Sequence, residues 1–187
     1  MEYFTSDHHF FHKNVLKFED RPCNTVEEMN ELLIEKWNKV VSKGDKVHHL
    51  GDFSFGNQDQ AIDVASRLNG QIIIYKGNHD NKNKLKRMLK EGVIKEYHLV
   101  GDYIKRSGYQ LWLTHYPVEI GYRPNMYSIH GHIHSSPSNY VNQINVGVDS
   151  LVFKDKVEFG EPISLEALLD EIKERNTVVK KLRQWNI

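Results

Sequence analysis

Residues 71–75 (QIIIY) limit the possible folds more than any other stretch of this 187-residue sequence. A continuous apolar run of this length, placed between Gly70 and Gly77, is typical of a strand that is buried on both faces. The sequence therefore predicts a β-sheet with this segment in its interior.

Helical patterns separate this run from other short apolar runs. Thr25 and Glu28 form a capping box that opens an amphipathic helix, which we expect to continue as far as Gly44. The other predicted elements of the first half are strands at residues 3–6 and 46–50 and a helix at residues 61–68. This alternation of strands and helices is typical of an α/β domain with crossover connections.

The second half of the chain predicts antiparallel strands and a terminal helix. Ser107-Gly108 separates two strand-like runs, which favours a β-hairpin. The predicted elements are a hairpin of residues 97–106 and 109–114, a strand over residues 140–148 and a helix over residues 164–175. Because no linker-like segment interrupts the chain, we expect one domain over residues 1–187 with a C-terminal helical tail.

Charge and cysteine content argue against several kinds of partner and site. The sequence has 25 lysine and arginine residues and 25 aspartate and glutamate residues. The formal net charge is therefore zero, and it gives the chain no overall electrostatic attraction to nucleic acid or to an anionic membrane. A single cysteine, Cys23, excludes an internal disulfide framework and a thiolate zinc cage. No run approaches the roughly 20 apolar residues of a membrane helix, and we find no signal-peptide pattern. We therefore expect a cytoplasmic protein.

Metal-binding residue types follow five predicted strands, at the point where each strand ends. These segments are Asp7-His8-His9, Gly51-Asp52, Gly77-Asn78-His79-Asp80, His115 and His130-Gly131-His132-Ile133-His134, the last of which follows a predicted strand at residues 126–129. Because the carboxyl ends of strands form the ligand crevice of an α/β sheet, we expect these side chains to meet in space.

Each segment has an ordinary structural explanation when it is taken alone. Asp7 can cap a turn, Gly77-Asn78 can close a strand, and residues 130–134 can bind metals adventitiously. Independent turns have no reason, however, to repeat carboxylate and imidazole groups at five successive strand ends. The conjunction of the five segments predicts a metal site.

The order of these motifs resembles the calcineurin-like metallophosphoesterase superfamily, from Asp-x-His through Gly-Asp, Gly-Asn-His-Asp and His to Gly-His-x-His, over residues 7–134. The segments YFTSDHHFFHKNVLKFEDRP and VHHLGDFSF are similar to a small bacterial and phage subgroup of these phosphoesterases. One departure is His8, which stands where that subgroup more often has threonine. The resemblance implies an α/β fold in which two mixed β-sheets form a sandwich flanked by helices.

The resemblance also implies a ligand set for two divalent metal ions. Asp7, His9 and His134 would hold one ion, Asn78, His115 and His132 the other, and the Asp52 carboxylate would bridge both. Oxygen and imidazole ligands suit manganese, which we expect, and also zinc, nickel or iron. Alternate side chains of an extended stretch share one side, so we expect Asp7 and His9 to face one pocket and His8 to point away.

The same resemblance assigns roles in phosphate-ester hydrolysis by a hydroxide that bridges the two metals. His79 would be the general acid and Asp80 would orient it, with a turn-capping role as the alternative for Asp80. Arg21, His12 and Arg123 are the candidates for substrate binding, and a guanidinium fork at Arg21 would grip a phosphate oxygen. Packing or solvent exposure is the alternative for each of these three residues.

We expect a phosphodiesterase that acts on a small nucleotide-type substrate, because short spacers between the motifs leave little room for a capping domain. The alternatives are a phosphomonoesterase or a nuclease with the same site, or a non-catalytic metal-binding protein of this fold. The presence of Asp52, Asn78 and His79 argues against the last of these. Neutral net charge makes long nucleic acid the less favoured substrate. The sequence identifies no oligomeric interface.

Overall fold

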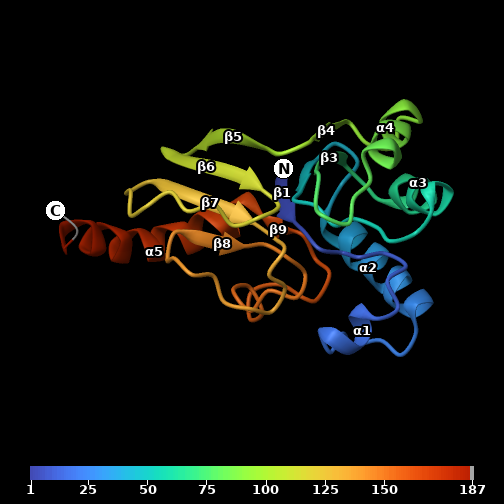
Figure 1. The fold of residues 1–187 in the computed structure, drawn as a ribbon, viewed down its shortest axis with the longest axis horizontal. Helices are drawn as coiled ribbons and strands as arrows, with labels where there is room; N and C mark the ends of the chain where they lie inside the picture. Colours follow the sequence, from blue (N-terminus) through green and yellow to red (C-terminus); the bar gives the residue numbers. More distant parts are fainter. Residues whose placement is uncertain (186–187) are drawn as a thin grey trace.

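Two β-sheets lie between helices in the computed structural model, which describes residues 1–185 (Figure 1). The first sheet has the strand order β4 (Glu96–His98), β3 (Gln71–Tyr75), β2 (Lys46–His49), β1 (Glu2–Thr5) and β9 (Ile163–Ser164). The second has the order β5 (Gly101–Arg106), β6 (Tyr109–Thr114), β7 (Met126–His130) and β8 (Gln143–Asn145). The helices are α1 (Val15–Phe18), α2 (Val26–Val40), α3 (Gln58–Arg67), α4 (Lys82–Lys90) and α5 (Leu165–Trp185). The expected domain span of 1–187 ends two residues beyond this described part.

Strands β1 to β4 run parallel and are joined through α2, α3 and α4, which confirms the predicted alternation. Only β9 runs antiparallel to its neighbour in this sheet. In Figure 1, α2, α3 and α4 gather on one side of the molecule, while α5 lies along the second sheet. The structure is therefore a mixed α/β fold with two mixed sheets flanked by helices. Within residues 1–185, no helix combines the length and the apolar character that crossing a membrane requires.

Helix α2 begins where its cap predicts and ends earlier than expected. The Thr25 Oγ1 accepts a hydrogen bond from the backbone N–H of Glu28 at 3.1 Å. The Glu28 carboxylate accepts from the N–H of Asn24 instead of that of Thr25, so the reciprocal half of the box is displaced by one residue. The helix stops at Val40 because Val41 adopts an extended conformation, with φ −94° and ψ 128°.

Other element boundaries differ from the prediction for identifiable reasons. Helix α3 begins at Gln58, three residues before the predicted apolar pattern, because Asn57 and Gln60 form a capping box. The predicted strand 97–106 is divided between the two sheets, since β4 pairs with β3 and β5 pairs with β6. Of the strand predicted over 140–148, only the three residues of β8 form a strand. Helix α5 continues to Trp185 and still buries Val179, four residues beyond its predicted end.

Strand β3 is buried on both faces, as its composition predicts. Ile72 and Ile74 pack in a core beneath the helices α2, α3 and α4. Ile73 and Tyr75 point the other way, into a second core shared with the second sheet and α5. Fully burying one such aliphatic side chain stabilises a fold by about 1.5–3 kcal/mol. The two cores hold β3 and its parallel neighbours in place.

Glu2 on β1 links the two sheets. Its carboxylate accepts hydrogen bonds from the Arg106 guanidinium on β5, at 2.5 and 2.7 Å, and lies 2.9 Å from the His48 Nε2 on β2. Burial opposes ionisation, but the hydrogen bonds from Arg106 and His48 outweigh it and hold the pKa of Glu2 at about 2. These contacts of Glu2 hold the two sheets together at the end of the sandwich where β1 begins.

The strand register brings the chemically interesting loops together. Thr5 pairs with His49, and His49 pairs with Ile74, so β1, β2 and β3 end in one row. In the second sheet Leu113 pairs with Ile129 and Ile129 with Ile144, so β6, β7 and β8 also end together. A bridge between Ser6 and Gly147 joins the two rows.

Candidate metal centre

The loops after these strands contain an unusual backbone conformation at the predicted metal ligands. Positive φ angles occur at Asp7 (59°), His9 (52°), Asp52 (54°), His132 (71°) and His134 (50°). Such left-handed residues cost about 1–3 kcal/mol each when they are not glycine, and they cluster at functional sites. The expectation of extended stretches is therefore wrong. The side chains of the candidate ligands come close together because the backbone turns sharply at each of these residues.

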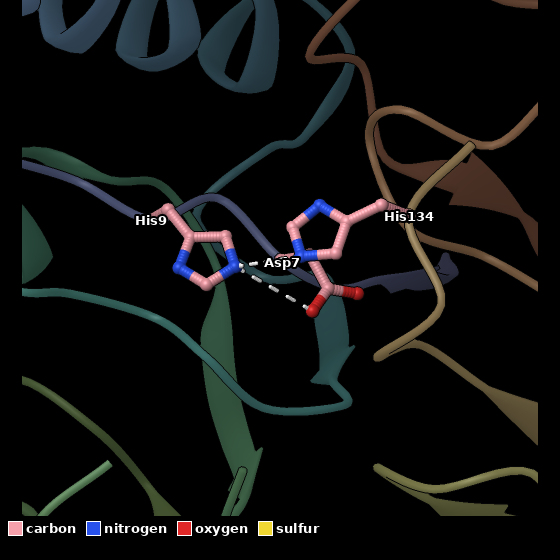
Figure 2. Close-up of side chains that lie close together, drawn as sticks. All are labelled: Asp7, His9 and His134. Atoms are coloured by element: carbon pink, nitrogen blue, oxygen red, sulfur yellow. Dashed lines mark hydrogen bonds and ion pairs between the residues drawn. The ribbon is translucent and has the colours of Figure 1, made fainter. Parts of the chain in front are cut away.

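Asp7, His9 and His134 form the first group of candidate ligands. The His9 Nε2 lies 3.3 Å from the His134 Nε2 and 3.8 Å from the Asp7 Oδ1. Figure 2 shows the two imidazole rings turned toward each other and toward the carboxylate. Two ligands that each lie about 2.1 Å from a tetrahedral metal are about 3.4 Å apart, so these spacings suit a shared ion.

Asn78, His115 and His132 form the second group. The Asn78 Oδ1 lies 2.9 Å from the His115 Nε2 and 2.9 Å from the His132 Nδ1. The Asp52 Oδ2 lies 3.4 Å from the His115 Nε2 and 3.8 Å from the His9 Nε2. One carboxylate oxygen thus stands between the two groups, in the position expected of a bridging ligand.

Hydrogen bonds at the outer nitrogens orient two of these imidazoles. The His134 Nδ1 lies 3.1 Å from the Asp149 Oδ2, and the His115 Nδ1 lies 2.8 Å from the carbonyl oxygen of Leu50. Each Nδ1 faces an acceptor and so carries a proton. Whenever the ring is neutral, its Nε2 lone pair is therefore directed into the centre. This is the tautomer that a metal ion needs.

Burial and neighbouring charges set the protonation of the carboxylates and imidazoles. Burial raises the pKa of Asp7 to about 6 and lowers that of His9 to about 2. Burial also opposes the ionisation of Asp52, but the hydrogen bond and charge of His115 hold the Asp52 pKa at about 2. Asp52 is therefore a carboxylate and His9 a neutral imidazole at pH 7.

Two observations indicate that the groups fit a cation. The Asp7 Oδ1 is buried and has no hydrogen-bond partner among the described residues, although its Oδ2 accepts from the backbone N–H of His132 at 2.9 Å. The Asn78 Oδ1 and the His115 Nε2 lone pair are both acceptors, yet they face each other at 2.9 Å. A metal ion between these groups would relieve both arrangements, whereas a proton on His115 would relieve only the second.

Glycines are required where the loops approach each other most closely. A Cβ atom at Gly131 would collide with the Ser6 hydroxyl and the Asp7 carboxylate. A Cβ atom at Gly77 would collide with the Asp52 carboxylate. Both glycines therefore allow the backbone to pass directly beside a candidate ligand.

Arg21 does not occupy the substrate-binding position predicted for it. Its five N–H groups donate to the Asp149 carboxylate, to the carbonyl oxygens of Asp7 and His8, and to the Met29 sulfur. The side chain is 0% exposed, so all of its donors are used inside the protein. Arg21 holds the loop after β1 and the Asp149 carboxylate in place.

Asp80 also differs from its predicted role. Its carboxylate accepts hydrogen bonds from the backbone N–H groups of Asp52, Phe53 and Gly77, at 2.8, 3.1 and 2.9 Å. Both oxygens are thus engaged by the backbone, which fixes the loops after β2 and β3 relative to each other. This is the turn-capping alternative, and Asp80 is a structural residue in this arrangement.

His79 and His12 lie at the candidate centre, whereas Arg123 lies far from it. The backbone N–H of His79 donates to the Asp52 Oδ1 at 2.8 Å, and the side chain is exposed. The His12 ring is 5.5 Å from the His9 ring. Arg123 precedes β7, whereas the ligands follow its other end, and a five-residue strand spans about 17 Å. The prediction that Arg123 binds substrate is therefore wrong.

The remaining histidines of these motifs are packing residues. His8 is buried against Phe10 and Trp37, with its Nδ1 3.0 Å from the His49 Nε2. His130 is buried, and its Nε2 lies 3.1 Å from the Ser138 hydroxyl oxygen. His8 thus points away from the candidate ligands, as predicted, and His130 contacts Gly131 and Ser138.

Sequence reasoning missed Asp149, which positions His134. It follows β8 in the same way that the other ligand loops follow their strands, through the turn Gly147-Val148-Asp149. The signal that located the other segments, a carboxylate just beyond a strand end, is therefore present here too.

Comparison with known proteins identifies relatives of this chain. No protein-family model matches the sequence. The chain is 34% identical over 191 residues to the uncharacterized protein MJ1445 of Methanocaldococcus jannaschii, covering 96% of this chain and 95% of that protein. The chain belongs to the family of MJ1445.

Two further relatives extend this MJ1445 family comparison. The gene 66 protein of Mycobacterium phage L5 is 28% identical over 196 residues, which cover 83% of this chain and 91% of the phage protein. The crystal structure of AQ665 from Aquifex aeolicus, a protein of unknown function, superposes with a TM-score of 0.69 at 25% identity. The superposed region covers 92% of this chain and 98% of AQ665, so both sheets of the sandwich have counterparts in AQ665.

Proposed function

We propose that this protein is a binuclear metal-dependent phosphoesterase of the calcineurin-like metallophosphoesterase type. The observation that carries the proposal is the position of Asp52, whose Oδ2 stands 3.8 Å from the His9 Nε2 and 3.4 Å from the His115 Nε2. One carboxylate thus serves two groups of ligands. A single-metal site has no need of this arrangement, whereas a pair of dications is stabilised by an anion between them.

The first ion would be held by Asp7, His9 and His134 and the second by Asn78, His115 and His132, with Asp52 shared. Two divalent ions, manganese by preference and otherwise zinc, nickel or iron, would supply Lewis-acid activation of water and of the phosphoryl oxygens when bound. Asp149 and the Leu50 carbonyl would keep the His134 and His115 rings in the ligating tautomer.

His79 is the proposed proton donor. Its backbone is fixed to the Asp52 carboxylate and its side chain is exposed beside the two ligand groups. In the proposed reaction a water oxygen bonds to phosphorus as the bond from phosphorus to the leaving oxygen breaks. His79 gives its proton to that leaving oxygen, and the water's proton passes to solvent. Asp80 contributes by holding the His79 loop against the Asp52 loop.

Small phosphodiesters of the nucleotide type are the proposed substrates. The exposed position of Asn78 and His79 suits a substrate that enters from solvent without a capping domain. The balance of 25 basic and 25 acidic residues disfavours long nucleic acid, which needs several phosphate contacts. Phosphomonoesters use the same attacking centre, so the two ester classes should be compared directly.

The test is hydrolysis of a chromogenic phosphodiester and of the matching monoester by metal-stripped protein, with manganese, nickel, zinc or magnesium added back. We expect metal-dependent turnover with the diester preferred, and a loss of about 100-fold or more in kcat for His79→Ala. His98→Asn is the matched control, because His98 stacks on Tyr75 at the edge of the first sheet. Two bound ions without turnover of any tested ester would instead favour a non-catalytic metal-binding protein.

A further inference from the structure

An exposed phenylalanine stands beside the proposed proton donor. Phe55 is 38% exposed, and its ring centroid lies 4.5 Å from that of His79 and 5.3 Å from that of His9. On another side its ring stacks on His12, with centroids 3.8 Å apart and planes 6° from parallel. The ring is therefore in contact with both the candidate ligands and solvent.

The loop that carries Phe55 is fixed by a buried charge. The Lys84 ammonium donates to the carbonyl oxygens of Ser54 and Gly56, at 2.8 and 2.6 Å, on either side of Phe55. The Phe55 N–H donates to the carbonyl oxygen of Phe10 at 2.8 Å. Lys84 is only 9% exposed, and burying an ammonium is costly unless its donors are used. The buried Lys84 thus holds the backbone on both sides of Phe55, and this keeps the exposed Phe55 ring beside the candidate centre.

Tyr116 is also exposed and contacts the candidate ligands His115 and His132, whereas Tyr103 is placed differently. Tyr103 has the same exposed fraction of 38%, but its ring packs against Trp112 and its hydroxyl donates to Gln110, away from the centre. The Phe55 ring instead contacts three imidazoles of the centre and its rim. An exposed aromatic surface at this position suits a flat, partly apolar group attached to the phosphate.

We propose that Phe55, backed by His12, forms a wall against which the nucleobase of a phosphate-ester substrate packs. This inference rests on the proposed function and deepens it, because it assigns the residues that would recognise the nucleobase. A nucleobase fits the wall because aromatic rings pack on one another in stacked or edge-on arrangements, and every base has a π-face. The base would lie beside His79 while the phosphate occupies the metal centre.

The test compares two ligands that differ only by the base, adenosine 5′-monophosphate and ribose 5-phosphate. Calorimetry measures the dissociation constant of each for the manganese-loaded full chain, and chromatography checks that each ligand is recovered intact. Aromatic contact with a base contributes about 5- to 150-fold to affinity. We expect adenosine 5′-monophosphate to bind at least about five-fold more tightly than ribose 5-phosphate.

Variants assign this preference to the wall. Phe55→Ala should bring the ratio of the two dissociation constants close to one, and Phe55→Trp should retain it. Phe55→Leu serves in place of Phe55→Ala if thermal melting shows the alanine variant to be unfolded. Tyr103→Ala is the matched control and should keep the full ratio, because Tyr103 lies on β5 in the second sheet.

Three results would overturn the proposal: equal affinities in the wild type, a preference that survives Phe55→Ala or Phe55→Leu, or no measurable binding of either ligand. The hydrolysis assay separates these results from a failure of the proposed function. Turnover of diesters with equal affinities would reject the wall and leave the phosphoesterase in place. A base preference that depends on Phe55, without turnover of any ester, would support the wall and reject the enzyme.

Discussion

The Arg21 guanidinium lies 2.7 Å from the Asp149 carboxylate, and the two side chains are 0% and 3% exposed. The same carboxylate lies 3.1 Å from the His134 Nδ1. A buried arginine therefore fixes a buried carboxylate, which in turn fixes the ring of a candidate metal ligand. The charge of Arg21 acts on the centre through these contacts and not through a substrate.

Asp149→Asn should weaken manganese binding without removing a ligand. The amide is a poorer acceptor for the His134 N–H, and loss of such a partner typically lowers metal affinity by 10- to 100-fold, or about 1.4–2.7 kcal/mol. Calorimetric titration of metal-stripped protein measures the change. Asp155→Asn, at an exposed position, is the control. Unchanged affinity in the Asp149 variant would show that this pair does not support the centre.

Gly131→Ala should disturb the centre because its methyl group would collide with Ser6 and Asp7. We expect a loss of about 1–3 kcal/mol in the free energy of unfolding and at least a ten-fold loss of metal affinity. Gly44→Ala is the matched control, since its added methyl group meets no atom within 4 Å. Denaturant unfolding with and without manganese measures both effects, and equal behaviour of the two variants would contradict this account of the loop.

Glu2→Gln should alter the pH dependence of stability. The Glu2 pKa is about 2 in the folded protein and 4.5 in the unfolded chain, so the ionised carboxylate stabilises the fold above about pH 4.5. That contribution is lost as the pH falls toward 2. At pH 7 the free energy of unfolding of the wild type should exceed that of the variant by about 1–3 kcal/mol. This difference in stability should shrink between pH 4.5 and 2.

Urea unfolding at a series of pH values measures the Glu2 effect. Glu35→Gln, which removes an exposed carboxylate from α2, is the control for the change in net charge. A difference between wild type and Glu2→Gln that does not vary with pH would mean that the tie to Arg106 and His48 contributes through packing alone.

The sequence predicted the strand ends that hold the candidate ligands more accurately than it predicted the contacts around them. Residue type and position relative to a strand were enough to bring Asp7, Asp52 and His115 together, since parallel strands in register end side by side. Which partner a polar side chain chooses depends on loop geometry, however. Arg21 was therefore assigned to substrate binding and Asp80 to catalysis. In the structure, both side chains form their hydrogen bonds with other groups of the protein.

Backbone conformation was the other missing part. A sequence that reads Asp-His-His gives no sign that Asp7 and His9 both adopt positive φ angles, because non-glycine residues do so only when the surrounding structure compensates for the cost. The split of residues 97–106 between two sheets likewise depends on pairing with β3 and β6, which lie elsewhere in the chain. Both features arise from tertiary contacts that local periodicity does not encode.

The number of manganese ions bound per chain tests the central claim most directly. Metal-stripped protein should take up two ions per chain in a calorimetric titration confirmed by elemental analysis, and Asp52→Asn should weaken both binding events together. Binding of a single ion, or an Asp52→Asn variant that still binds two ions with unchanged affinity, would contradict a binuclear centre bridged by Asp52.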